Sequence, residues 1–201
     1  MKLGLVGAGN IGGTLGKKWA VKNHEVFFGV RNPQKETLVS EMQSVDGNIK
    51  LGLAADAIAA SEVIVFAVPG ASVEQLVSEN AESLAGKIVI DASNNMRGDS
   101  RNSLSYIAQK VPAARLFRAF SSLGWENFEN PEFAGVKADL FYCGDEDARA
   151  TVEALIFDIG LEPVYLGGTD QAGLVEGMTD MWFTLALRQK MGRRIAFKLL
   201  K

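Results

Sequence analysis

Lys2-Leu3-Gly4-Leu5-Val6-Gly7-Ala8-Gly9-Asn10-Ile11-Gly12-Gly13 is an apolar segment that runs directly into a G-x-G-x-x-G loop. We expect a short strand beginning at Lys2 and a helix over Thr14 to Val21. The first glycine permits a tight turn, the second lets the backbone approach a pyrophosphate, and the third lets the helix pack close to the strand. A helix N-terminus favours such an anion. The stretch therefore predicts a dinucleotide site rather than a plain glycine-rich turn, and its expected cofactor-binding residues are Gly7, Gly9, Asn10, Ile11 and Gly12.

The end of the second predicted strand, Glu25–Gly29, indicates which nucleotide binds. An NAD site places an acidic residue there to accept a hydrogen bond from the ribose 2′-hydroxyl, whereas this chain continues with Val30-Arg31-Asn32-Pro33-Gln34-Lys35. Arg31 offers a planar, bidentate donor for a 2′-phosphate, and Lys35 adds a second cation one helical turn later. We therefore expect NADP(H), held by Arg31, Asn32 and Lys35; a solvated basic turn is the alternative.

Composition is that of a compact enzyme with one full core. The chain has 201 residues, of which 47% are hydrophobic, and a net charge of −3, which disfavours nucleic acid as a partner. The uncharged stretch Val63 to Val73 has 11 residues, far fewer than the roughly 20 that a membrane helix needs. A strand beginning at residue 2 leaves no room for a signal peptide, and one cysteine forms no intrachain disulfide. We expect a cytoplasmic protein without a membrane partner.

Apolar runs alternate with helical patterns, which is typical of βαβ units. Further strands are predicted at Val63 to Ala67, Ile88 to Ile90, Arg115 to Ala119, Leu140 to Cys143 and Pro163 to Leu166. Helices are predicted near Gln34 to Gln43, Ser72 to Ser83, Ser103 to Gln109 and Glu146 to Ile159. The expected fold is a Rossmann-type, doubly wound, mostly parallel α/β sheet. Residues 1–168 would form the NADP-binding domain, and residues 169–201 a short helical tail that completes the acceptor site or a dimer interface.

Three loops that follow predicted strands are expected to line the binding cleft, because ligands of open α/β sheets gather at the carboxyl ends of the strands. Ordinary turn chemistry explains each loop taken alone. Together they predict further cofactor contacts from Val68, Pro69, Asn94, Asn95 and Gly124. They also predict acceptor contacts from Phe120, Ser121, Ser122 and Trp125.

At these residues the chain resembles the NADP-dependent oxidoreductases that reduce a deazaflavin coenzyme, and the reductase domains of the STEAP metalloreductases. The resemblance rests on the glycine loop, Gly29-Val30-Arg31, Val68-Pro69 and the carboxyl third from Tyr142 onward. The run 93–97 and the loop ending at Trp125 look closer to the metalloreductase branch. The resemblance implies NADPH with its 2′-phosphate on Arg31. It also implies a ring acceptor, a deazaflavin or FMN/FAD, stacked near the nicotinamide.

Two departures from the family pattern qualify this resemblance. Val30 stands where relatives often have serine or threonine, which removes one phosphate hydrogen bond. No haem-binding membrane domain is present in the sequence, which argues against direct metal reduction through haem. Two other functions stay open: reduction of another small acceptor, such as an imine or quinone, and non-enzymatic sensing of NADP(H). The apolar tail suits a homodimer interface or packing within one chain.

The sequence predicts no catalytic residue and no metal site. Hydride transfer between nicotinamide and a flavin-like ring needs little acid–base assistance, since the two rings carry the electronics and the protein aligns them. The only histidine, His24, is expected to be structural, and Asp91 to cap a turn. Cys143 is expected to be a buried small hydrophobic residue rather than a reactive thiol.

Overall fold

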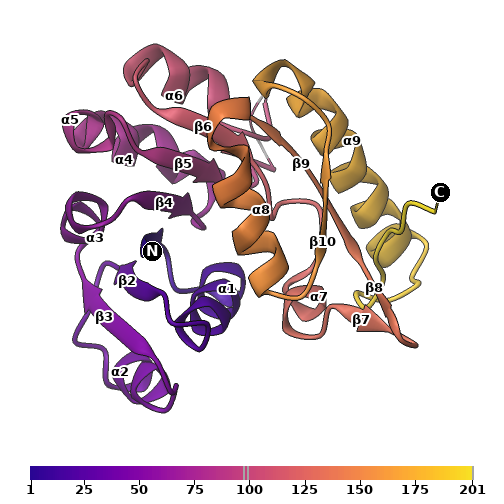
Figure 1. The fold of residues 1–201 in the computed structure, drawn as a ribbon, viewed down its shortest axis with the longest axis horizontal. Helices are drawn as coiled ribbons and strands as arrows, with labels where there is room; N and C mark the ends of the chain where they lie inside the picture. The colour runs from indigo at the N-terminus through magenta and orange to yellow at the C-terminus, as the bar shows by residue number, and fades with distance from the viewer. Residues whose placement is uncertain (97, 99, 201) are drawn as a thin grey trace.

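The computed structural model describes residues 1–96, 98 and 100–200, and its centre is an eight-stranded sheet (Figure 1). In spatial order the strands are β10 (Glu162–Tyr165), β9 (Asp139–Gly144), β6 (Arg115–Arg118), β5 (Ile88–Asp91), β4 (Val63–Phe66), β1 (Lys2–Val6), β2 (Glu25–Gly29) and β3 (Asn48–Gly52). From β3 to β6 all neighbours are parallel, β9 is antiparallel to β6, and β10 is parallel to β9. The predicted Rossmann-type, mostly parallel α/β fold is confirmed.

Helices cover both faces of this sheet. They are α1 (Asn10–Ala20), α2 (Glu36–Gln43), α3 (Ala54–Ala60), α4 (Val73–Glu79), α5 (Ala81–Leu84), α6 (Leu104–Lys110), α7 (Trp125–Glu129), α8 (Arg149–Asp158) and α9 (Ala172–Phe183). A separate hairpin joins β7 (Glu132–Phe133) to β8 (Val136–Lys137). The chain order of strand, helix and strand follows the βαβ rule, because parallel neighbours need a crossover.

The alternation of side chains along β4 shows why the sheet needs cover on both sides. Val63 and Val65 belong to one core with Trp19 of α1, whereas Ile64 and Phe66 belong to a second core with α3, α4 and α6. Successive strand residues point to opposite faces, so a strand buried on both faces must be apolar throughout. All four residues of β4 are buried.

The structure contains elements that the sequence did not predict. Strand β3 lies at the edge of the sheet, where only Ile49 and Leu51 face the core, so its run NIKLG lacks a continuous apolar signal. Helix α1 begins at Asn10 instead of Thr14, because Gly12 and Gly13 adopt helical structure despite their low propensity. The helix predicted over Ser72 to Ser83 is interrupted at Asn80, between α4 and α5. The sequence also gave no sign of α3, α7, β7 or β8.

The C-terminal segment contains one helix followed by an extended return. Helix α9 lies along β9 and continues into a π-helical turn over Thr184–Arg188 (Figure 1). The chain then folds back: the indole N–H of Trp182 donates to the carbonyl of Ile195, and Phe197 forms a β-bridge with Asp139. The short helical tail predicted here is therefore present as α9 and the turn that follows it. No helix in the described part of the chain has the length and apolar character to cross a membrane.

Candidate dinucleotide site

The glycine loop between β1 and α1 has the geometry that its spacing predicts. Gly7 has a φ of +106°, which favours glycine, and a Cβ there would lie 2.5 Å from the carbonyl oxygen of Ala67. A Cβ at Gly12 would overlap the carbonyl oxygen of Gly7, so only glycine lets α1 pack this close to the strand. A Cβ at Gly9 would meet nothing within 4 Å. The space at Gly9 is therefore open to a ligand.

The N-terminus of α1 has the electrostatic character of an anion site. Its cap residue Gly9 provides no side-chain hydrogen bond to the first turn, and this turn contains no acidic residue. Gly9 and Asn10 are exposed, and Ile11 is half-buried. Backbone N–H groups of the first turn and the positive end of the helix dipole are therefore available to a pyrophosphate. Lys17 and Lys18, in the last turn, complement the opposite end.

The turn after β2 presents two cations to solvent. Arg31 and Lys35 are exposed, and neither side chain has a hydrogen bond or ion pair with any residue that the structure describes. The side-chain oxygen of Asn32 accepts a hydrogen bond from the N–H of Gln34, 3.2 Å away, which shapes the turn. Lys35 was predicted to follow Arg31 by one helical turn; instead both precede α2, and Lys35 is its cap residue. A non-helical turn therefore carries both cations.

Three predicted loops meet at the carboxyl ends of β4, β5 and β6. Pro69, after β4, forms a parallel β-bridge with Asn94, after β5. The side-chain amide of Asn94 then donates to the carbonyl of Ser121, after β6, at 3.2 Å. Asn94 therefore links all three loops. The next residue, Asn95, accepts a hydrogen bond from the N–H of Gly98 and donates its own N–H to the carbonyl of Arg101.

The residues predicted to contact the acceptor differ in how deeply their side chains are buried. Ser121 and Ser122 are buried, and the hydroxyl oxygen of Ser121 has no hydrogen-bond partner within the described structure. Trp125 is half-buried at the start of α7. Phe120 differs from the prediction: its side chain is fully buried, 5.5 Å from the ring of Trp19, so it belongs to the core rather than to a cleft wall.

Val68 and Gly124 complete the predicted set. Val68 is half-buried after β4 and packs against the second core. Gly124 precedes α7, and a Cβ there would lie 2.7 Å from the ring of Trp182 on α9. The C-terminal helix therefore borders the loop after β6. Arg97, within the run 93–97, lies outside the described residues.

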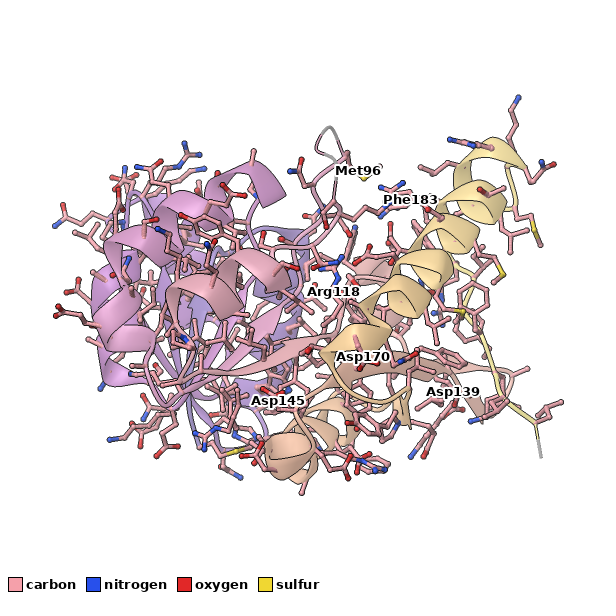
Figure 2. All side chains as sticks on the ribbon, turned by 90° about the horizontal axis from the view of Figure 1, so that it is seen from above. Met96, Arg118, Asp139, Asp145, Asp170 and Phe183 are labelled. Atoms are coloured by element: carbon pink, nitrogen blue, oxygen red, sulfur yellow. The ribbon has the colours of Figure 1, made fainter. Side chains whose placement is uncertain are left out.

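Arg118, the last residue of β6, is the central residue that the sequence analysis missed. Its side chain is completely buried and makes hydrogen bonds to the carbonyls of Asp91 and Ser93, the side-chain oxygen of Asn94, and Glu176 of α9. Figure 2 shows Arg118 beside α9. The sequence signal was an arginine directly after the apolar pair Leu116 and Phe117, at the end of the strand.

Asp91 and His24 have structural roles, as predicted. One carboxylate oxygen of Asp91 accepts hydrogen bonds from the N–H and the hydroxyl of Ser93, and the other accepts one from the N–H of Ser103. Asp91 therefore caps the loop after β5. His24 lies 2.8 Å from Asp158 of α8 and contacts the N-terminal amine, remote from the glycine loop's helix start. In residues 1–96, 98 and 100–200, no group of His, Cys, Asp and Glu side chains could hold a metal ion.

Cys143 is expected to be unreactive in the folded protein. Its side chain is completely buried, and this burial raises the pKa of the thiol to about 11. At pH 8 the thiolate is therefore scarce as well as inaccessible. Ellman's reagent should modify no thiol in the native protein at pH 8 and one after unfolding in guanidinium. Rapid modification of the native protein, before any unfolding, would contradict this assignment.

Residues 2–95 match the model of the family NADP oxidoreductase coenzyme F420-dependent. The matched segment contains the glycine loop, Arg31 and Asn94. A solved structure from Arthrobacter sp. FB24, assigned as an F420-dependent NADP-reductase, is 25% identical with a TM-score of 0.87, and the match covers 100% of both chains. The resemblance predicted from the sequence is confirmed.

Other relatives are longer than this chain. Metalloreductase STEAP3 of Rattus norvegicus is 27% identical over an alignment of 184 residues that covers 88% of this chain and 36% of the rat protein. The chain thus spans about a third of that relative. A Streptomyces aurantiacus imine reductase has 17% identity and a TM-score of 0.71 over 94% of this chain and 64% of its own; this likeness concerns the fold alone. The family match and the Arthrobacter structure relate the chain to NADP-dependent oxidoreductases.

Proposed function

We propose that the protein is an NADPH-dependent oxidoreductase that transfers a hydride between NADP(H) and a deazaflavin or flavin acceptor. Two features carry this proposal. The α1 N-terminus is open and uncapped, and the exposed turn with Arg31 and Lys35 follows the neighbouring strand β2. One binds a pyrophosphate and the other a 2′-phosphate, and only NADP(H) among the common dinucleotides carries both groups.

The residues present fit this cofactor. Gly9 leaves room where a Cβ would otherwise stand. On the acceptor side of this site, the hydroxyl of Ser121 is a buried polar group that has no protein partner in the described structure. An unsatisfied buried hydroxyl costs about 1–3 kcal/mol, so a ligand that bonds to it gains from the interaction. We assign the pyrophosphate to the α1 N-terminus, the 2′-phosphate to Arg31, Asn32 and Lys35, and the nicotinamide half to the loops linked by Asn94.

A deazaflavin or flavin is the proposed acceptor because the matched family and the Arthrobacter structure both name coenzyme F420. Ser121, Ser122 and Trp125 offer two hydroxyls and one aromatic ring beside the nicotinamide loops. Phe120 belongs to the same loop, but its ring packs on Trp19 and Phe128 in the core and anchors the loop there. The acceptor is therefore proposed to lie against the loop after β6 rather than against Phe120 itself.

The chemistry requires alignment from the protein and little else. NADPH supplies the hydride when bound. The loops after β4, β5 and β6 hold the reacting ring, and their hydrogen bonds to one another limit its movement. The contacts of α9 with Gly124 and Arg118 cover part of this edge and restrict access of water there. No side chain needs to act as a nucleophile or a general base.

We also propose that residues 169–201 complete the acceptor side of the cleft. Trp182 packs near Gly124, and Glu176 contacts Arg118 of the sheet. A homodimer through the exposed apolar residues of this segment, such as Leu174 and Met181, stays a prediction that sedimentation equilibrium can test.

Deuterium at the transferred position of NADPH is expected to slow single-turnover reduction of the acceptor and to appear in reduced F420. The reason is that direct transfer breaks the C–D bond in the measured step. F420, FMN, FAD and riboflavin should each be mixed with deuterated and ordinary NADPH, with an imine and a quinone as comparison acceptors, and the products analysed by mass spectrometry.

The outcomes of this experiment are distinct. Reduction of an imine or quinone alone would keep the NADPH-dependent reductase but replace the flavin-type acceptor. Tight NADPH binding without reduction of any acceptor would overturn the oxidoreductase and favour an NADP(H) sensor. Solvent hydrogen in reduced F420 instead of deuterium would exclude direct transfer.

A further inference from the structure

Arg118 uses its entire hydrogen-bonding capacity inside the protein. Its Nε donates to Glu176 at 2.8 Å, Nη1 donates to the carbonyls of Asp91 and Ser93, and Nη2 donates to Asn94 at 2.8 Å and to Glu176 at 3.4 Å. These contacts occupy all five N–H groups of a guanidinium. A buried cation is tolerated only with such pairing, and the carboxylates of Asp91 and Glu176 supply the opposite charge.

These contacts determine the orientation of the Asn94 amide. A guanidinium cannot accept a hydrogen bond, so the oxygen of Asn94 must face Arg118. The carbonyl of Ser121 cannot donate, so the Asn94 nitrogen must face Ser121. One N–H of the amide is used by Ser121, and the second has no partner among the described residues, which leaves it for a ligand. Asn94 is half-buried, so this N–H is a donor that a ligand can reach.

Glu176 of α9 pairs with Arg118 from outside the sheet. Its side chain is 16% exposed and also accepts a hydrogen bond from the amide of Asn102 at 3.1 Å. Glu176 stands on α9, 58 residues from Arg118 in sequence. The C-terminal helix thereby reaches Asn94 through a single arginine.

We propose that Arg118, held by Glu176, is a positioning residue that presents Asn94 as a hydrogen-bond donor to the nicotinamide half of NADP(H). This inference rests on the proposed function, because it assigns the ligand of Asn94 to the cofactor. Arg118 itself touches no cofactor; it acts through Asn94. The donor suits an acceptor group such as the carboxamide oxygen or a ribose hydroxyl oxygen.

Glu176→Gln is the informative variant, since Arg118 is fully buried and its replacement risks unfolding. Glutamine has one oxygen where glutamate has two, so its NH₂ group would face a donor of Arg118 and loosen the guanidinium. Affinity for NADPH should fall by about two- to tenfold, the range of one neutral hydrogen bond. Affinity for 2′,5′-ADP, which has no nicotinamide, should stay unchanged. The single-turnover transfer rate should fall by about tenfold to a hundredfold through misalignment.

A double-mutant cycle with Asn94→Ala separates positioning from general destabilisation. If Glu176 acts through Asn94, the double variant should match Asn94→Ala alone in NADPH affinity and transfer rate. Glu153→Gln is the matched control: Glu153 also pairs with an arginine, Arg149, at 2.9 Å, and lies on α8. It should lower the melting temperature comparably and leave the NADPH to 2′,5′-ADP affinity ratio unchanged.

The transfer assay tests the proposed function, and the affinity ratio tests the positioning role of Arg118. If wild-type protein reduces neither F420 nor FMN, the proposed function fails, but the affinity ratio still decides the positioning role. Equal loss of NADPH and 2′,5′-ADP affinity in Glu176→Gln would overturn the proposal. Unchanged affinity of Glu176→Gln for both NADPH and 2′,5′-ADP would also overturn the proposal. So would a double variant whose loss equals the product of the losses in Glu176→Gln and Asn94→Ala.

Discussion

Gly9→Val is expected to abolish NADPH binding while the protein stays folded. Gly9 has φ −77° and ψ −166°, an extended conformation that valine adopts readily, and a Cβ there meets no protein atom within 4 Å. The side chain would instead fill the space through which the pyrophosphate reaches the α1 N-terminus. Titration of NADPH fluorescence should show no saturation, while circular dichroism and the melting temperature should remain near those of the wild type.

Two other glycines serve as controls for this result. Gly173→Val adds the same side chain at another open position, on α9, and should leave NADPH binding intact. Gly12→Ala should lower the melting temperature instead, because its Cβ would overlap the carbonyl oxygen of Gly7. Normal NADPH titration by folded Gly9→Val would remove the central argument for a dinucleotide site.

Arg31→Ala should weaken NADPH binding by about tenfold to a hundredfold and change NADH binding little. Hydrogen bonds to charged groups contribute about 1.5–3 kcal/mol each, and only NADPH has the 2′-phosphate that Arg31 would bind. Arg31 is exposed and has no side-chain partner in the described structure, so its loss should not destabilise the fold. Isothermal titration with both nucleotides, at one salt concentration, measures the difference.

The control for Arg31→Ala removes one exposed arginine at a position outside the turn after β2. Arg188→Ala removes an exposed arginine near the end of α9 and should affect neither nucleotide. Lys35→Ala should cause a smaller loss than Arg31→Ala, since an ammonium lacks the bidentate geometry of a guanidinium. Equal losses for NADPH and NADH in Arg31→Ala would refute the assignment of NADP(H).

Most of the fold could be predicted because its signals are local. Strand β4 is apolar at every position since both its faces are buried, and such a run is visible without any tertiary information. Edge strand β3 buries only part of one face, and its alternation of Ile49 and Leu51 with polar residues was too short to identify. Short helices such as α7 carry equally little local signal.

The residues of the candidate site also fall into those that local sequence predicted and those that it did not. The spacing of Gly7, Gly9 and Gly12 was sufficient to predict the turn and the close packing of α1, although the atoms that exclude a Cβ at Gly7 come from Ala67 on a neighbouring strand end. Phe120 was misplaced because its φ of +60°, a value that no local pattern indicated, accompanies a side chain packed among core aromatics. A residue at the end of a strand can face the cleft or the core, and local sequence does not distinguish them.

By itself, the sequence determined the sheet class, the dinucleotide loop and the cation that replaces an acid after β2, because each depends on neighbouring residues. Only the tertiary structure decided how Asn94, the proposed donor to the nicotinamide half, is held in place. Arg118 finds its partners 24 to 27 residues away, at the end of β5 and on the loop after it, and 58 residues away on α9. A buried guanidinium needs acceptors on several sides, and no single segment of chain can surround it.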